Sequence, residues 1–119
     1  MIETTNATDL ISFITRDIEL NAIFYGNRRL ARKLLETGRR VDFVGLDGSG
    51  PAPTKLVPDG VEWRALGAPR VRQQVKRLAK YYRMRRPAVV LASGFNEGLA
   101  CVAASWLVRR PPRIVVRVH

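Results

Sequence analysis

The segment from residue 85 to residue 107 constrains the fold of this chain more than any other stretch. Pro87 is followed by five consecutive apolar residues, 88–92. Such an unbroken run is typical of a strand that is covered on both faces, as in a parallel sheet. Ser93 and Gly94 then begin a turn, after which apolar side chains recur at helical spacing. The segment therefore predicts a strand, a tight turn and a helix.

The rest of the chain adds further strands and helices in alternation. Strands are predicted at residues 10–14, 41–46, 61–66 and 113–118, and helices at residues 22–37 and 70–85. This alternation favours an α/β fold with a parallel sheet. Right-handed crossovers then give a doubly wound, Rossmann-like sheet of five strands in the order 3-2-1-4-5. We expect one such domain at residues 10–119, after a polar tail at residues 1–9.

The apolar side chains of the three predicted helices form stripes that we expect to face the sheet. The stripes are Ile23, Leu30, Ala31, Leu34 and Leu35 in the first helix, Val71, Val75, Leu78, Ala79 and Tyr82 in the second, and Leu99, Val102, Ala103, Trp106 and Leu107 in the third. In the fourth strand, Val90 and Leu91 are predicted to be fully buried. Cys101 is the single cysteine, which excludes an intramolecular disulfide and a cysteine-rich zinc site, and we expect it in the core.

The carboxyl ends of the predicted strands provide a candidate binding edge. In the order 3-2-1-4-5, the loops after the first and fourth strands meet at the switch point, where α/β sheets bind ligands. The first of these loops is residues 16–21, and the second contains Ser93, Gly94 and Asn96. We expect His119, at the end of the fifth strand, to lie beside them. The polar side chains of the second loop can bind a hydroxylated ligand, or they can form a turn and a helix N-cap.

The charge balance favours anionic partners. The chain has 21 lysine and arginine residues against 10 aspartate and glutamate residues, a net charge of +11. Such a charge attracts nucleic acid, an anionic membrane surface or phosphorylated ligands. No apolar stretch approaches the roughly 20 residues that span a bilayer, and the start of the chain lacks the features of a signal peptide. We therefore expect a cytoplasmic protein that meets a membrane only at its cytoplasmic face.

The second predicted helix has a basic face. Residues 70–86 contain eight basic residues and no acid. A basic amphipathic helix is typical of proteins that bind a membrane surface or a partner, although a solvated face has the same pattern. We expect its outward side chains to bind anionic lipid, while its apolar stripe stays on the sheet and does not insert deeply. These outward residues are Lys76, Arg77, Lys80 and Arg83.

Four stretches of the sequence follow one another in the pattern of a known family. They read LARKLLETGRRVDFVGL, PDGVEWRALGAP, RRPAVVLASGFNEGLACVAASWL and PPRIVVRVH. In this order they resemble the first helix with the second strand, the third strand, the fourth strand with its helix, and the fifth strand of GT-B glycosyltransferases of family 4. The resemblance is to the N-terminal, Rossmann-like half of that fold and covers residues 10–119.

The resemblance implies a nucleotide-sugar-dependent hexosyltransferase whose N-terminal half binds the acceptor, a sugar or a lipid-linked sugar. It implies that His119 is a catalytic residue. The substrate-binding residues that it implies are Arg16, Asp17, Ser93, Gly94 and Asn96. The nucleotide-sugar donor belongs to a C-terminal half without a counterpart in these 119 residues. We therefore expect a truncated, acceptor-side domain with no cofactor of its own and no turnover alone.

One loop departs from the pattern of that family. Its members commonly have a glycine-rich turn after the first strand, whose amides face the donor phosphates. Residues 16–21 contain no glycine, so a donor contact by this loop is not implied.

A second class of function stays open: a free-standing basic α/β module that binds an anionic membrane or nucleic acid. Proteins that bind single-stranded nucleic acid often interleave aromatic side chains with their cations for base stacking. Tyr81 and Tyr82 are the only aromatic residues of the basic helix, and Tyr82 is predicted to face inward. The sequence therefore favours a membrane over nucleic acid as the anionic partner.

Overall fold

The computed structural model describes residues 9–16, 22–47 and 57–117, and it confirms the predicted α/β fold. The strands are β1 (Leu10–Thr15), β2 (Arg40–Gly45), β3 (Val61–Ala65), β4 (Val89–Ser93) and β5 (Arg113–Arg117). The helices are α1 (Ala22–Glu36), α2 (Val71–Arg85) and α3 (Phe95–Ser105). All neighbouring strands are parallel, and their order is β3-β2-β1-β4-β5, as predicted.

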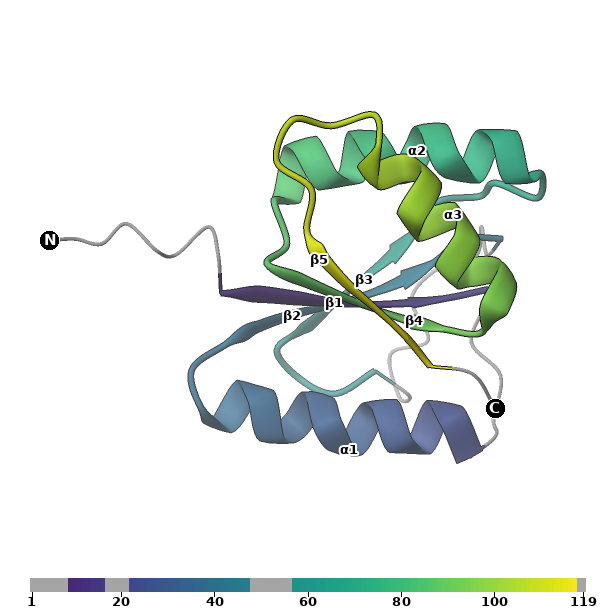
Figure 1. The fold of residues 1–119 in the computed structure, drawn as a ribbon. Helices are drawn as coiled ribbons and strands as arrows, with labels where there is room; N and C mark the ends of the chain where they lie inside the picture. The colour runs from purple at the N-terminus through teal and green to yellow at the C-terminus, as the bar shows by residue number, and fades with distance from the viewer. Residues whose placement is uncertain (1–8, 17–21, 48–56, 118–119) are drawn as a thin grey trace, which may run out of the picture.

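Helices cover both faces of this sheet. α1 lies on one face, and α2 and α3 lie against each other on the other face (Figure 1). β1 is the central strand, and its residues 10–14 are all buried, in keeping with their almost continuous apolar sequence. The strands β3 and β5 form the two edges and are largely half-exposed or exposed.

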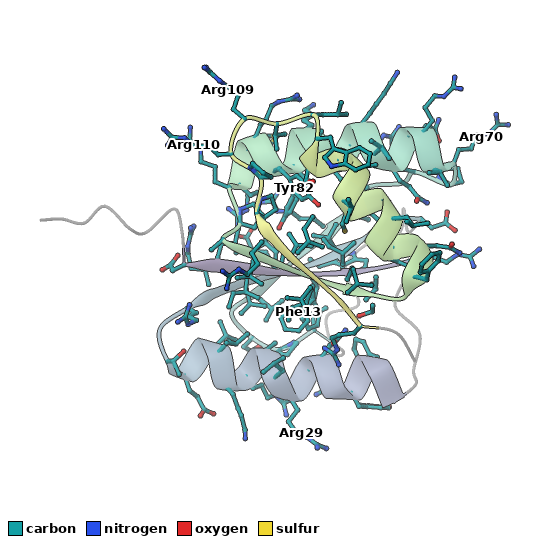
Figure 2. The ribbon with its side chains drawn as sticks, in the orientation of Figure 1. Phe13, Arg29, Arg70, Tyr82, Arg109 and Arg110 are labelled. Atoms are coloured by element: carbon teal, nitrogen blue, oxygen red, sulfur yellow. The ribbon has the colours of Figure 1, made fainter. Side chains whose placement is uncertain are left out.

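Two apolar clusters lie on the two faces of the sheet. On the α1 face, the rings of Phe13 and Phe43 pack edge to face with centroids 5.3 Å apart, and Phe24 of α1 packs against Phe43 at 6.5 Å. On the other face, the Tyr82 hydroxyl donates to the Cys101 carbonyl over 3.0 Å and joins α2 to α3. Figure 2 shows Phe13 on the α1 side and Tyr82 on the α2 side. Burial raises the pKa of the Cys101 thiol to about 12, as expected for a core residue.

The predicted burial of β4 is half right. Val90 is fully buried between the sheet and the α2–α3 layer, as expected. Leu91 points to the other face and is only half-buried, so its predicted full burial is wrong. The reason is that α1, the one described helix on that face, packs mainly against β2, away from β4. Two other predicted core residues, Val71 in the first turn of α2 and Leu30 of α1, are exposed as well.

The third helix presents a different face to the sheet from the predicted one. Leu99, Trp106 and Leu107 are 54%, 79% and 51% exposed, so their predicted place in the core is wrong. The buried face consists of the small residues Gly98, Ala100, Cys101 and Ala104. These residues allow α3 to lie close to β5, because a Cβ on Gly98 would be only 2.7 Å from a methyl carbon of Val116. Since α3 carries apolar residues on both faces, periodicity alone does not tell which face is buried.

A buried carboxylate network, which we call the Asp42 network, joins three strands to α2. Ser12, Asp42 and Glu62 occupy matching positions on β1, β2 and β3. Arg85 donates from Nε and Nη2 to the two carboxylate oxygens of Asp42 over 3.0 and 2.8 Å, and from Nη2 to Glu62 over 2.9 Å. The Tyr81 hydroxyl donates to Asp42 over 2.6 Å and lies 2.5 Å from the Ser12 hydroxyl, which is therefore its donor.

The two members of this network that come from α2 hold their protons more tightly than usual. Burial, with the nearby Asp42 carboxylate as the second cause, raises the pKa of Tyr81. The hydrogen bond to Asp42 raises the pKa of Arg85. Arg85 is one of the eight basic residues of the sequence 70–86, but its side chain is turned inward and is only 20% exposed. It therefore belongs to the interior of the domain and not to the basic face.

We expect Val90→Asp to prevent folding, because an unpaired charge in the centre of the sheet costs more than about 4 kcal/mol. A domain of this size has a free energy of unfolding of only about 5–15 kcal/mol. Leu91→Asp is expected to fold with a lowered melting temperature, because its half-buried side chain can reach water. Thermal melting followed by circular dichroism compares the two, and equal melting curves would contradict their placement.

Asp42→Ala is expected to lower the free energy of unfolding by about 3 kcal/mol, because it leaves the Arg85 charge and the Tyr81 hydroxyl without their buried partner. The matched control is Glu62→Ala, which removes a carboxylate that binds the same arginine but is 58% exposed. It is expected to cost about 1 kcal/mol or less. Urea titration measures both, and a larger loss for the Glu62 variant would refute the central position of Asp42.

Candidate functional site

The candidate site lies where the parallel strands end. The carboxyl ends of all five strands meet at one edge of the sheet, on the right in Figure 1. β1 and β4 are neighbours at the centre of the sheet, and the chain leaves them toward opposite sides of it. Such a switch point is where open α/β sheets bind their ligands.

Three polar side chains from three elements meet at this edge, and we call them the switch-point cluster. Ser93 ends β4 and is paired in register with Arg117, which ends β5. Asn27 of α1 is 2% exposed. Its amide nitrogen donates to the Ser93 hydroxyl over 3.3 Å, and its amide oxygen accepts from Arg117 Nη1 over 2.8 Å. The cluster thus fixes the ends of β4 and β5 against α1.

The turn after Ser93 depends on a glycine. Gly94 has a φ of 124°, a backbone conformation that disfavours other residues. Its amide donates to the Arg117 carbonyl over 2.9 Å, and an added Cβ would be 2.2 Å from an oxygen of Glu97. Gly94 is also the N-cap residue of α3, where no side chain forms a capping hydrogen bond. Ser93 and Asn96 therefore do not cap this helix, and the N-cap alternative is excluded.

The structure brings together part of the predicted rim. Ser93 and Gly94 lie at the switch point, and Asn96 follows them in the first turn of α3 with an exposed side chain. Arg16 lies at the end of β1, but its exposed guanidinium pairs with Asp47 at 3.5 Å. The predictions for Asp17 and His119 lie outside the described residues. Within residues 9–16, 22–47 and 57–117, no hydrogen bond involves the Asn96 side chain, so its amide is available to a ligand.

Sequence reasoning missed two members of the switch-point cluster, Asn27 and Arg117. Asn27 follows Ile23 by four residues and precedes Ala31 by four, so it interrupts the predicted inner stripe of the first helix. A polar residue inside an apolar stripe is a signal for a buried hydrogen bond and could have identified it. Arg117 had a weaker signal, because its pairing with Ser93 depends on the strand register, which the sequence does not define.

The groups at this edge can bind a polar ligand. The half-buried Ser93 hydroxyl and Arg117 guanidinium and the exposed Asn96 amide can form hydrogen bonds with hydroxyl groups, and the guanidinium can attract an anion. Among the described residues, no group of three or more histidine, cysteine, aspartate or glutamate side chains could hold a metal ion. No helix in the described part of the chain is long and apolar enough to cross a membrane.

A cavity of about 340 Å³ lies elsewhere, on the outer surface of α1. Long side chains of the helix form its walls: Tyr25, Arg28, Arg29, Arg32, Lys33 and Glu36. It includes no residue of the switch-point cluster, and it is a shallow hollow between exposed side chains. We therefore do not assign it to the candidate site.

The predicted basic face of α2 is exposed, but two of its four cations have structural partners. Lys76, Arg77, Lys80 and Arg83 are all exposed. Arg77 Nη1 donates to the carbonyls of Leu66 and Gly67, and Arg83 Nη2 donates to the Leu107 carbonyl over 2.7 Å. For Lys76 and Lys80, no hydrogen bond or ion pair with a described residue is found. These two lysines are therefore the positions where charge can be removed with least effect on folding.

No protein-family model matches this sequence, and no curated protein sequence matches it. The structure shows the fold, which is a parallel α/β sheet with the Rossmann-like order 3-2-1-4-5.

Proposed function

We propose that this chain is the acceptor-binding domain of a nucleotide-sugar-dependent glycosyltransferase. The observation that carries the proposal is the polar edge at the switch point, where Ser93 and Gly94 lie beside Asn27 and Arg117, and where the exposed Asn96 follows in the first turn of α3. The resemblance of residues 10–119 to the N-terminal half of the GT-B fold suggests which ligand this edge binds. In that half, the same edge faces the acceptor.

A sugar acceptor suits the groups at this edge. Each sugar hydroxyl donates and accepts hydrogen bonds, and the exposed amide of Asn96 can do both. The Gly94 turn brings backbone close to the ligand without a side chain in the way. Arg117 adds a positive charge, which suits a phosphate such as the one in a lipid-linked sugar. Specificity for the acceptor thus comes from the loop after β4, and Asn27 of α1 holds the start of this loop through its hydrogen bond to Ser93.

The remaining roles follow from the resemblance. His119, two residues beyond Arg117, is proposed as the catalytic residue, and Arg16 and Asp17 are proposed to contact the substrate. The nucleotide-sugar donor is proposed to bind a second Rossmann-like half. The proposal thus assigns acceptor binding to this chain and transfer to the complete two-half enzyme.

The test is binding of acceptor sugars to the isolated chain. In a titration with a panel of alkyl glycosides, amide NMR shifts are expected to concentrate at residues 93–98. Asn96→Ala is expected to weaken binding at least about fivefold, the value of one lost hydrogen bond. Gln73→Ala is the matched control, because it removes an exposed amide from α2 instead. Shifts that avoid the β4–α3 loop, or equal affinities of the two variants, would count against the proposal.

A second candidate function rests on a different observation, the exposed cations of α2. A basic module that adheres to an anionic membrane needs several cations on one surface, each worth about 1 kcal/mol near anionic lipid. Residues 70–86 contain eight cations and no acidic residue. The apolar stripe residues Leu78, Ala79 and Tyr82 are buried, so α2 itself offers charge rather than insertion.

Lys76→Gln with Lys80→Gln is expected to remove most binding to phosphatidylglycerol vesicles, measured by co-sedimentation. Binding of the unaltered chain is expected to fall with salt, because the Debye length shrinks from about 10 Å at 0.1 M to about 3 Å at 1 M. The matched control is Arg29→Gln with Arg32→Gln, an equal loss of charge from α1. Equal losses in both variants would indicate a net-charge effect only, and displacement by duplex DNA would favour a nucleic-acid partner.

A further inference from the structure

One line of side chains along α3 is apolar, and we call it the α3 outer face. It consists of the exposed Phe95 and Leu99, the half-buried Val102, and the exposed Trp106 at the C-cap position. Their spacing of four, three and four residues places them in one line along the helix. Phe95 is 64% exposed, and Trp106, at 79%, is the most exposed large apolar side chain of the described residues. A row of this kind is unusual on a free protein surface and marks a contact with something apolar.

The charge around this row is positive. Glu97 is the only acid between residues 63 and 119, and it is half-buried. Arg109 and Arg110 follow α3 and extend away from the domain on the α2–α3 side, whereas Arg29 extends from the opposite side (Figure 2). Arg83 of α2 donates to the Leu107 carbonyl over 2.7 Å, which fixes a cation beside the end of the row.

We infer that the α3 outer face inserts into the interfacial region of an anionic bilayer, with the helix lying parallel to the membrane. An apolar face flanked by cations is the pattern of helices that lie in the interface plane. A tryptophan is a preferred residue at that depth, and the arginines beside it reach the phosphate level. The inference deepens the second proposed function and rests on it: α2 supplies the attraction, and α3 supplies the inserted apolar surface.

The charge of the chain argues for lipid rather than a second copy as the occupant. Two copies that meet through this face would bring Arg109, Arg110 and Arg83 of each close to those of the other. With a net charge of +11 on each chain and one half-buried acid in this region, such a contact is repulsive. An anionic lipid surface turns the same charges into an attraction.

The test uses Trp106 as its own reporter. Trp63→Phe leaves Trp106 as the only tryptophan, and the lost indole nitrogen has no hydrogen-bond partner in the described part of the chain. With vesicles of phosphatidylcholine and phosphatidylglycerol, Trp106 emission is expected to shift to the blue and to become protected from iodide. Leu99→Ser in this background, and Trp106→Ser assayed by co-sedimentation, are each expected to lower the partition coefficient about tenfold. Tyr25→Ser, an exposed aromatic on α1, is the matched control and is expected to change nothing.

Each result separates the inference from the functions proposed above. Vesicle binding with unchanged Trp106 emission would overturn insertion by α3 and leave the basic face of α2 as the membrane contact. No vesicle binding at all would overturn both. Self-association that Trp106→Ser abolishes, without an effect on vesicle binding, would identify a second copy as the occupant and overturn the inference. The sugar titration does not bear on any of these outcomes.

Discussion

The buried carboxylate of Asp42 is the interaction on which the orientation of α2 depends. A carboxylate without access to water is stable only if a cation and hydrogen-bond donors reach it. Tyr81 and Arg85, four residues apart on α2, both reach it, and this sets the rotation of the helix about its axis. With that rotation, Tyr82 lies on the apolar cluster and Lys80 points to solvent. Asp42 and the buried apolar side chains of α2 therefore together turn the basic face outward.

Polar side chains inside the sheet and polar side chains at its carboxyl edge differ in how they are satisfied, and this difference locates the candidate site. On the α2 face of the sheet, the buried carboxylate of Asp42 is fully occupied by Tyr81 and Arg85. At the carboxyl edge, Asn27 satisfies Ser93 and Arg117 from beneath, while the neighbouring Asn96 stays exposed. The hydrogen bonds from Asn27 hold the ends of β4 and β5 in place, and the Asn96 amide remains available to a ligand. The fold thus supplies a rigid base and an accessible rim at the switch point.

The sequence predicts the architecture well and the side-chain environment less well. The apolar run at residues 88–92 and the alternation of elements were sufficient for the sheet and its order, because connection rules leave few alternatives. Ser93 and Gly94 could be placed at the edge for the same reason. Asn27 could not, because its partners come from β4 and β5, far away in sequence. Leu91 was misjudged because the coverage of a strand depends on where α1 lies across the sheet.

The error on α3 has a physical cause that also explains its surface. A helix with apolar residues on two faces can bury either its large or its small side chains. Burying Gly98, Ala100 and Ala104 brings α3 close to β5 and α2, and close packing gains dispersion contacts along the whole helix. The large side chains Leu99 and Trp106 are then left outside. The exposed row therefore accompanies the close packing of the small residues against β5 and α2, and it gives the protein a surface suited to an apolar environment.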